Sequence, residues 1–548
     1  MQETHFLKKI LLKYKYQIII MLIMSLFLWT INILNTYIIG KYIDILVYDI
    51  ELNTIYFFTV LLFVLGLLNI IISNFNNYIS TKTQTNMVFD INLKILKHVK
   101  KLPISFFDNK DPIYLNQRIN SDSNALINFS ISSTIQLITQ IIIFIIIFFI
   151  LGTKNFQITI VTLLSIPMYL ALYFLFKKKL YKVIFNYKEE QNKLFSNMNK
   201  HLFNISFIKL NSLFDDLDKE LLNLYPNFLK SLLKYIVCNY SFSSIASTLE
   251  NIFNVFLFFY GGIAIFNKKM TIGDFIIIKS YYSIILNTIS NLTNILKSYP
   301  EAKVCHNRIT EILSIPKEKN GEKILKSINS ITLENLDLKI NKTQILKQVN
   351  YKFELGKVYI IKGVNGSGKS SLIKSVLGLY LSDIKGKIMY NDTDINNLDL
   401  YHIRKKIISF LDQEPVLLHS TIYENLTQDI DNINFDNLYD LINKFNLNLP
   451  ESDKKRHSYE LNHFSGGEKQ KISLIRILMK ETNLIIMDEP TSALDSNSIN
   501  ILKNILMQIQ KNKIIIIVSH DERIYDIADT VINFEDINSN YKIHEYVE

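Results

Sequence analysis

Six long apolar runs dominate the first 300 residues of this chain of 548 residues. They lie at about residues 17–37, 54–72, 132–151, 157–176, 245–266 and 275–296. Each run is close to the ~20 residues that a helix needs to cross a bilayer. The first run is too long for a signal peptide and lacks a small-residue cleavage site, so we expect it to be retained. The pattern predicts a membrane domain of six helices over residues 1–300, in contact with a lipid bilayer.

Basic residues indicate the orientation of these helices. Two long connections, residues 76–123 and 177–240, are rich in lysine, whereas the others are short and carry few basic residues. Positively charged connections stay in the cytoplasm, so the N-terminus, both long connections and the C-terminal half are expected there. The net charge of +10 therefore reflects membrane orientation and does not indicate a nucleic-acid partner. Both long connections are expected to extend the membrane helices and to turn through short segments, at residues 106–118 and 203–214.

Polar residues inside the apolar runs are candidates for a cargo path. Glu250 lies in the fifth run, where an ionisable side chain is costly and normally faces a cavity or a partner. It either lines a path that favours cationic cargo or makes a hydrogen bond between helices. Similar stripes in other runs more often join helices than bind cargo. They share one helix face each, and they comprise Ser132, Ser133, Gln136 and Gln140 in the third run and Asn287, Asn291 and Asn294 in the sixth.

The sequence pattern changes after residue 300. Residues 301–330 form a charged linker, and from residue 331 short β-rich runs alternate with helical runs. This alternation predicts a cytoplasmic α/β nucleotide-binding domain over residues 331–548. Cys238 and Cys305 are the two cysteines of the chain, and neither has the spacing of a metal or redox site.

A glycine-rich loop is the strongest motif of this second half. A β-branched run at residues 357–361 precedes it and a helical run at 371–377 follows it, which is the context of a phosphate-binding P-loop. Inward-pointing N–H groups and the helix N-terminus attract phosphate. Lys369 adds a positive charge, and the Ser370 hydroxyl can ligate Mg²⁺. The loop residues are Gly363, Val364, Asn365, Gly366, Ser367, Gly368, Lys369, Ser370 and Ser371.

Acidic and imidazole side chains follow two further apolar runs. Asp488 closes one run and is placed to hold the Mg²⁺ hydration shell, and Glu489 next to it is a candidate general base. His520 follows the other run and could contact a γ-phosphate or the attacking water. Between the P-loop and these acids, Ser465-Gly466-Gly467-Glu468 opens a helical stretch and offers a second nest for anionic oxygens.

The order and spacing of these motifs resemble the ATP-binding cassette (ABC) superfamily, and the resemblance covers the whole chain. Phe464-Ser465-Gly466-Gly467-Glu468 looks like the family signature, and Gln413 looks like the glutamine of its Q-loop. Asp495 and His520 match the D-loop and the H-loop. One membrane domain followed by one cassette resembles a half-transporter of the bacterial exporter type.

Two segments of the membrane half carry the same resemblance. Phe106-Phe107-Asp108 is similar to the first cytoplasmic turn of exporter-type members, and Thr271-Ile272-Gly273-Asp274 to the lead-in to their sixth helix. The resemblance implies that the segments at 106–118 and 203–214 couple the cassettes to the membrane domain.

The resemblance also implies ATP and Mg²⁺ as cofactors of an ATP hydrolase. Ser370, Gln413 and Asp488 would hold the metal, partly through water, and Glu489 and His520 would carry out hydrolysis. Two chains are needed, because the P-loop of one and the signature of the other clasp the same ATP. The second chain is expected to be identical, with a different half-transporter as the alternative. The dimer would lie in the bacterial cytoplasmic membrane.

Two departures from the family pattern concern the cassette. Ile340 occupies the position where an aromatic side chain usually stacks on adenine, and Ser458-Tyr459-Glu460-Leu461 lacks the glycine-rich stretch of many exporters. No cysteine precedes Cys238, so we expect no N-terminal cysteine peptidase. The cargo would be a peptide, a lipid or an amphipathic small molecule. The alternatives are a non-transporting channel or sensor on the same scaffold and a siderophore importer with exporter architecture.

Overall fold

A computed structural model describes the chain in two compact units. The described residues are 3–48, 51–107, 112–154, 156–340, 343–417, 421–428, 430, 433–447 and 464–538. The first unit comprises Met1–Val99 and Ile113–Ser314, and the second comprises Lys100–Pro112 and Ile315–Glu548. The exporter-type segment residue Asp108 and the stretch at 458–461 lie outside the described residues.

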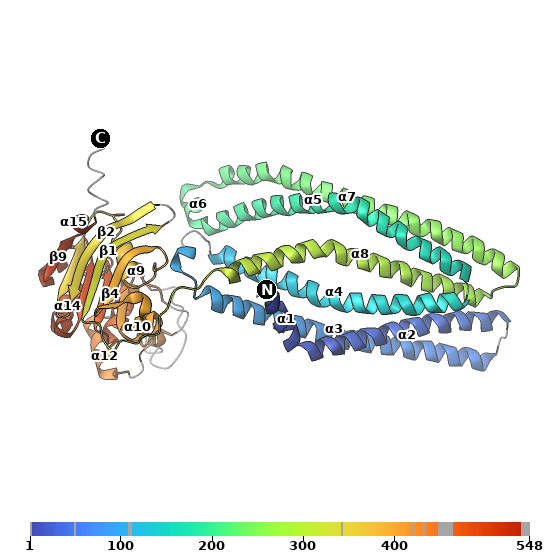
Figure 1. The fold of residues 1–548 in the computed structure, drawn as a ribbon, viewed down its shortest axis with the longest axis horizontal. Coiled ribbons are helices and arrows are strands. Elements are labelled where there is room, and N and C mark those ends of the chain that lie inside the picture. Colours follow the sequence, from blue (N-terminus) through green and yellow to red (C-terminus); the bar gives the residue numbers. More distant parts are fainter. Residues whose placement is uncertain are drawn as a thin grey trace. The chain divides into compact units, whose positions relative to one another are not determined.

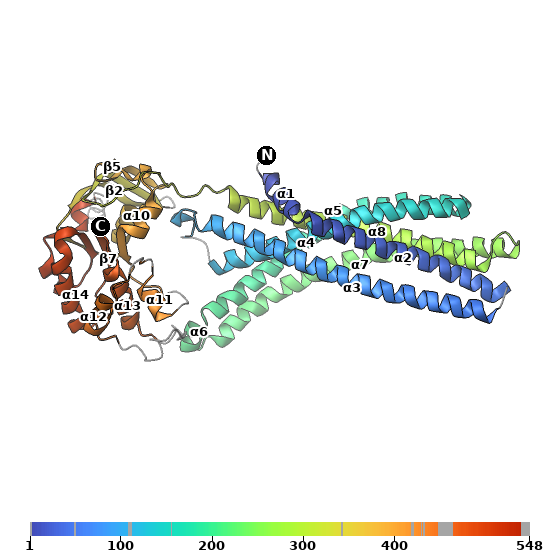
Figure 2. The ribbon, with the colours of Figure 1, turned by 90° about the horizontal axis from the view of Figure 1, so that it is seen from below.

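Long helices make up the first unit (Figure 1). Each of the six predicted apolar runs lies in a helix of its own, α2, α3, α4, α5, α7 or α8. In both ribbon views α2 runs beside α3, and α5 runs beside α7, to which α6 joins it (Figures 1 and 2). The bounds are α1 Glu3–Lys13, α2 Lys15–Tyr48, α3 Leu52–Val99, α4 Pro112–Lys154, α5 Phe156–Phe203, α6 Ile205–Asn211, α7 Phe214–Phe266 and α8 Ile272–Ser314.

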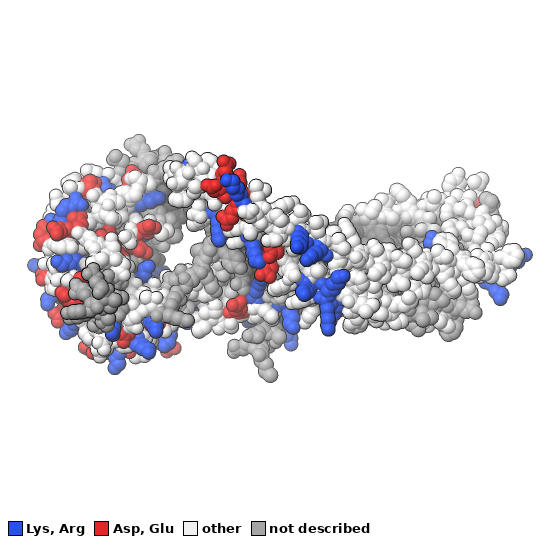
Figure 3. All heavy atoms as spheres, turned by 90° about the horizontal axis from the view of Figure 1, so that it is seen from above, with Lys and Arg blue, Asp and Glu red and all other residues white. Residues whose placement is uncertain are grey.

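The helix lengths and surfaces agree with a membrane domain that extends into water. Among the described residues, α2, α3, α4, α7 and α8 are long and apolar enough to cross a membrane. The fourth predicted run lies in α5, several of whose side chains near residues 156–166 are not described. The 53 residues of α7 would span about 80 Å, far more than the ~30 Å of a hydrocarbon core. Figure 3 shows few charged side chains over the half of this unit that carries the apolar runs.

The short helix α6 lies within the predicted turn at 203–214. The other predicted turn, 106–118, begins at the last residue of the 3₁₀ helix η1 (Ile104–Phe106), and from Pro112 onward it is the start of α4. η1 belongs to the second unit, where Ile104 packs against the hydrophobic core. α8 continues through Pro300 to Ser314, so the first part of the expected linker is helical.

The start of α8 explains the exporter-like sequence Thr271-Ile272-Gly273-Asp274. The Asp44 carboxylate of α2 accepts hydrogen bonds from the Thr271 hydroxyl at 2.8 Å and from the Gly273 N–H at 2.7 Å. A Cβ atom at Gly273 would lie 2.1 Å from the Gly40 carbonyl oxygen. The close approach of the two helices therefore requires glycine, and Asp44 satisfies the Gly273 N–H at the helix start.

Two sheets form the second unit. The antiparallel sheet has the strand order β2-β1-β4-β5, and the parallel sheet has the order β6-β7-β8-β3-β9. The predicted runs at 357–361, 484–488 and 514–518 are confirmed as β3, β7 and β8. The bounds are β1 Ser330–Ile340, β2 Thr343–Glu354, β3 Val358–Lys362, β4 Ile384–Tyr390, β5 Thr393–Asp394, β6 Ile408–Leu411, β7 Leu484–Asp488, β8 Ile514–Val518 and β9 Thr530–Asn533.

Helices cover the parallel sheet, because its strands are apolar on both faces. Alternate residues of β3 pack into two cores: Tyr359 and Ile361 into one, Val358 and Ile360 into the other. The helices of this unit are α9 Lys369–Val376, α10 Leu400–Lys406, α11 Ile422–Leu426, α12 Phe435–Lys444, α13 Gly466–Met479, α14 Ser496–Ile509 and α15 Phe534–Ile537, with 3₁₀ turns η2 Ile395–Asn397, η5 Gln510–Asn512 and η6 Glu522–Ile527.

Candidate ATP site

The parallel sheet gathers the predicted site residues at one edge. β7, β8 and β3 are neighbours with the same direction, so their carboxyl ends meet. β3 leads into the loop 363–368, β7 ends at Asp488, and β8 is followed by Ser519 and His520. Ligands of open α/β sheets bind at this edge.

The loop 363–368 needs its glycines. Gly366 and Gly368 have φ values of +80° and +106°, in the left-handed region that glycine tolerates best. At Gly368 a Cβ atom would also meet the Ile345 side chain at 2.9 Å. α9 begins directly after Gly368, so its free N–H groups point into the loop. The loop and helix start therefore form the anion-binding nest that the sequence predicts.

Lys369 bends back over this loop. Its ammonium group donates hydrogen bonds to the carbonyl oxygens of Gly363 at 2.7 Å and Val364 at 2.9 Å. Burial lowers the pKa of Lys369, and the carboxylates of Glu489 and Asp488 partly oppose that shift. The side chain is thus a buried positive charge within reach of the same edge, as a phosphate-binding lysine must be.

Asp488 and Ser370 form the part of the site that suits a hard cation. Asp488 is 3% exposed, and the Ser370 hydroxyl donates a hydrogen bond to its carboxylate. Burial raises the pKa of Asp488, although the hydrogen bond from Ser370 opposes the shift. The buried Ser367 hydroxyl has no hydrogen-bond partner within the described part of the chain. Adjacent carboxylate and hydroxyl oxygens fit Mg²⁺, whose charge would favour the ionised form of Asp488.

Glu489 has an unusual backbone conformation that aims its carboxylate. Its φ is +47°, which is uncommon for a residue with a Cβ atom. The Glu489 N–H donates to the Val518 carbonyl at 2.8 Å, and the Oε1 atom lies 3.8 Å from Nε2 of His520. Burial raises the pKa of Glu489, and the neighbouring His520 lowers it. The structure therefore brings the predicted base and the predicted imidazole together.

The signature segment lies on a different helix. Ser465 and Glu468 form a capping box at the start of α13: Glu468 N–H donates to the Ser465 hydroxyl at 3.3 Å, and Ser465 N–H donates to Glu468 at 2.8 Å. The capping box thus explains why a glutamate at this position suits the start of the helix. In the described ranges no hydrogen bond or ion pair joins residues 465–468 to the loop 363–368.

Two family models match this chain. One, described as the ABC transporter transmembrane region, matches residues 18–289, and the other, described as ABC transporter, matches residues 346–492. The chain belongs to the ATP-binding cassette transporter family. As an ABC transporter it binds ATP and couples ATP hydrolysis to transport, and it is a multi-pass membrane protein.

Relatives of this ABC transporter are bacterial. The lactococcin transport/processing ATP-binding protein LcnC-like of Lactococcus lactis subsp. lactis (strain IL1403) is 23% identical over 538 residues, which cover 96% of this chain and 74% of the relative. The transport/processing ATP-binding protein ComA of Streptococcus pneumoniae is 25% identical over 520 residues, covering 89% and 69%. A solved bacterial Atm1-family ABC exporter with ATP bound has a TM-score of 0.82 at 15% identity, covering 98% of this chain and 99% of that one. The fold is therefore that of an ABC exporter.

Two residues of the ABC signature helix do not figure in the sequence prediction. Gln470 is 1% exposed, and its Nε2 atom donates to the carbonyls of Glu489 at 3.3 Å and Pro490 at 3.1 Å. The Lys471 ammonium lies 3.0 Å from the Asp495 carboxylate, which also caps α14. The hydrogen bond from the Ser498 N–H, together with Lys471 and the Ser498 hydroxyl, holds the pKa of Asp495 well below its ordinary value. Their position, three and four residues after Gly467, was the only sequence feature that could have suggested a role for Gln470 and Lys471. Their partners are distant in sequence, so no local pattern links the pairs.

Gln413 follows β6, which pairs in parallel with β7, so it lies at the same sheet edge as Asp488. Gln413 is exposed, and its N–H donates to Asp412 at 2.9 Å. Ile340 ends β1 as a partly buried residue, and Ile345 packs on the loop at Gly368. An aliphatic side chain thus occupies the position where the family usually has an aromatic, and a second one, Ile345, lies against the phosphate loop.

Glu250 lies in the helical unit beside two tyrosines. It is partly buried on α7 and interacts electrostatically with Tyr169 of α5 and Tyr282 of α8. The Tyr169 hydroxyl donates to the Ala246 carbonyl at 3.1 Å. The Tyr282 hydroxyl is buried and has no partner among the described residues. Glu250 therefore faces a polar cluster within the helices and not an apolar wall.

Proposed function

We propose that this chain is one half of a dimeric peptide exporter of the bacterial cytoplasmic membrane. The observation that carries the proposal is the cluster of Lys369, Ser370, Asp488, Glu489 and His520 at one edge of the parallel sheet. It supports ATP hydrolysis as the energy source.

Each side chain of the cluster has a separate part in hydrolysis. The N–H groups of the loop 363–368 and Lys369 bind the phosphates. Ser370 and Asp488, with Gln413, would hold Mg²⁺, which neutralises charge on the phosphate oxygens when it is bound. Glu489 accepts the proton of the attacking water, and His520 orients the water and the γ-phosphate.

The signature supports a dimer. Ser465, Gly466 and Gly467 offer a helix start and N–H groups, and no hydrogen bond joins them to the phosphate loop of the same chain among the described residues. A second chain can present these groups to the ATP held by the first. This chain keeps its own phosphate loop, Glu489 and His520, so two identical copies would be self-sufficient. The N-terminus and the cassette would face the cytoplasm, because the long connections are basic.

The relatives support a peptide cargo. They are named for the transport and processing of lactococcin, and this chain aligns with them over both the helices and the cassette. A helical unit with polar side chains between its apolar helices suits a cargo that carries hydrogen-bonding groups.

ATP turnover of the purified chain in lipid tests the energy source. The wild type is expected to hydrolyse ATP, and Glu489→Gln to bind ATP but hydrolyse it at least ~100-fold more slowly, since general-base catalysis contributes that much. Glu481→Gln, the same change at an exposed position, is the control and should match the wild type. Wild-type turnover by Glu489→Gln would reject the base assignment.

Mixing two inactive variants tests the dimer. Lys369→Ala and Ser465→Arg chains should each be inactive alone, because every phosphate site has one defect. In a mixed dimer both defects fall in one site and the other site is intact. Turnover should therefore appear on mixing, and its absence with folded chains that form mixed dimers would contradict the shared site.

A further inference from the structure

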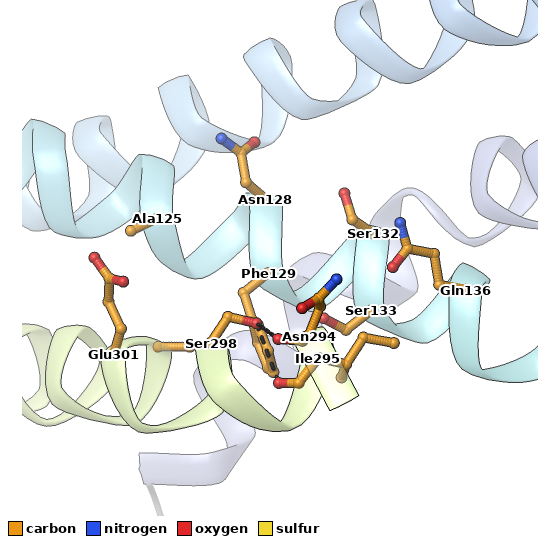
Figure 4. A pocket seen from close by; sticks show the side chains of 11 residues that line it. Ala125, Asn128, Phe129, Ser132, Ser133, Gln136, Asn294, Ile295, Ser298 and Glu301 are labelled. Atoms are coloured by element: carbon orange, nitrogen blue, oxygen red, sulfur yellow. Dashed lines mark hydrogen bonds between the residues drawn. The ribbon is translucent and has the colours of Figure 1, made fainter. Parts of the chain in front are cut away.

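A cavity of about 410 Å³ opens between α4 and α8 (Figure 4). Its size is in the range of pockets that hold small molecules. The lining residues of each helix repeat every three or four positions and so form one continuous face. They are Ala125, Asn128, Phe129, Ser132, Ser133 and Gln136 of α4, and Asn294, Ile295, Ser298, Glu301 and Ala302 of α8.

The cavity lies at the ends of two apolar runs. The lining starts before the apolar run of α4 at 132–151 and continues past that of α8 at 275–296. The α4 end leads back to the basic connection at 76–123, and the α8 end leads to the linker and the cassette. The positive-inside rule assigns all of these segments to the cytoplasm. The cavity is thus at the level where a cargo from the cytoplasm would first meet the bilayer.

The side-chain amides of this cavity differ from others in the same helices. Elsewhere amides bond to one another, as Asn69 does to Asn32 at 2.7 Å and Asn92 to Asn120 at 3.1 Å. In the cavity Asn128, Gln136 and Asn294 are exposed and have no hydrogen-bond partner in the described residues. Hydrogen bonding between helices therefore explains the amides of the first group, but it does not explain the three amides of the cavity.

A buried hydroxyl and an apolar floor complete the cavity. Ser133 is 7% exposed, lines the cavity and has no partner within the ranges described. The Phe129 ring reaches from α4 toward α8 (Figure 4). Its centroid lies 6.2 Å from that of the Tyr299 ring. Ile295 and Ala302 are buried beside it. The cavity thus alternates amide and hydroxyl groups with flat apolar surface.

The charges of the cavity are already paired. Glu301 lies at one end and forms an ion pair with Lys188 of α5. The rest of the lining is neutral, so neither a cation nor an anion finds an uncompensated charge there.

We propose that this cavity binds a short, extended, uncharged segment of a peptide as it leaves the cytoplasm. A side-chain amide carries the same C=O acceptor and N–H donors as the peptide group, so Asn128, Gln136 and Asn294 can bond to a peptide backbone in either direction. Phe129 offers apolar contact to small side chains between these bonds. The inference rests on the proposed peptide export and specifies which part of the cargo is recognised first.

Protection of an introduced thiol tests the site directly. The full chain in lipid carries Ser298→Cys, and a water-soluble maleimide labels it in the presence and absence of a short blocked peptide of glycine, serine and asparagine. The native Cys238 and Cys305 are buried, so they react slowly. Saturating peptide is expected to slow labelling at Ser298→Cys several-fold. Asn307→Cys is the control: it lies exposed on α8 outside the cavity and should show no protection.

Three outcomes would overturn the proposal. Labelling at Ser298→Cys that peptide does not slow would reject the site, and equal protection at both positions would indicate general adsorption. If the same peptide with lysine in place of asparagine protected the thiol more strongly, the proposal that the cavity binds an uncharged segment would be rejected. Adding Asn294→Leu and Gln136→Leu should abolish protection. Labelling does not require ATP hydrolysis, so these results are independent of ATP turnover. A lack of ATP turnover by the wild type would instead count against the proposed exporter.

Discussion

Gln470 holds the backbone of the proposed base, so its loss should slow hydrolysis without affecting ATP binding. Glu489 has a φ of +47°, a conformation that costs about 1–3 kcal/mol in a residue other than glycine. The Val518 carbonyl binds its N–H, and Gln470 binds its carbonyl at 3.3 Å and that of Pro490 at 3.1 Å. Gln470→Met keeps the size of this buried side chain and removes both hydrogen bonds.

The expected magnitude follows from these bonds. A hydrogen bond contributes ~0.5–1.5 kcal/mol, and the Ser492 N–H still reaches the Glu489 carbonyl at 3.3 Å. We therefore expect a loss of about 1–2 kcal/mol. If this loss falls on the left-handed conformation of Glu489, the aimed carboxylate is ~10-fold less populated and kcat falls about tenfold, since ~1.4 kcal/mol is a factor of ten. KM for ATP should change little, because the phosphate loop follows β3 and makes no contact with Gln470 among the described hydrogen bonds.

Steady-state kinetics and thermal melting together test this reasoning. Gln470→Met should lower kcat about tenfold and the melting temperature of the cassette by about 2–4 °C per kcal/mol. Gln508→Met makes the same change at an exposed position of α14 and should leave both quantities unchanged. A lower melting temperature with unchanged kcat would show that Gln470 only packs α13, and would refute its part in positioning Glu489.

Four further changes have defined outcomes. Burial raises the pKa of Glu489, so ionising its carboxyl group destabilises the fold as the pH rises above the ordinary value near 4.5. Without nucleotide, Glu489→Gln should therefore have the same melting temperature as the wild type below that pH and a higher one at neutral pH. Equal melting at pH 7 would contradict this. Ile340→Tyr should tighten ATP binding severalfold in a fluorescence titration, unless another side chain holds adenine. Arg404→Leu removes an ion pair of 3.3 Å with Glu318, and should lower the melting temperature by an amount equivalent to about 1 kcal/mol. Glu250→Ala should change the stimulation of ATP turnover by peptide, and equal stimulation would leave it a structural role.

Local patterns were sufficient to predict the strands and helices that build the site. β3, β7 and β8 are continuous β-branched or aliphatic runs, because both faces of each strand are buried. The six apolar runs likewise became separate helices, since a bilayer or a core must cover each of them.

Contacts between distant segments were not predictable in the same way. The linker expected from residue 301 begins inside α8, which continues through Pro300 to Ser314. Gln470 and Lys471 reach partners about 20 residues away, and no local periodicity marks such pairs. The polar stripes of α4 and α8 were visible as patterns, but their facing one another across a cavity depends on the packing of the helices.

Peptide accumulation in inside-out membrane vesicles tests the central claim most directly. Vesicles that contain the wild type should take up a labelled peptide cargo when ATP is supplied outside, because the cassettes then face the medium. Vesicles with Glu489→Gln should bind ATP and accumulate no peptide above background. Uptake without ATP, or equal uptake by Glu489→Gln, would contradict transport driven by this ATP site.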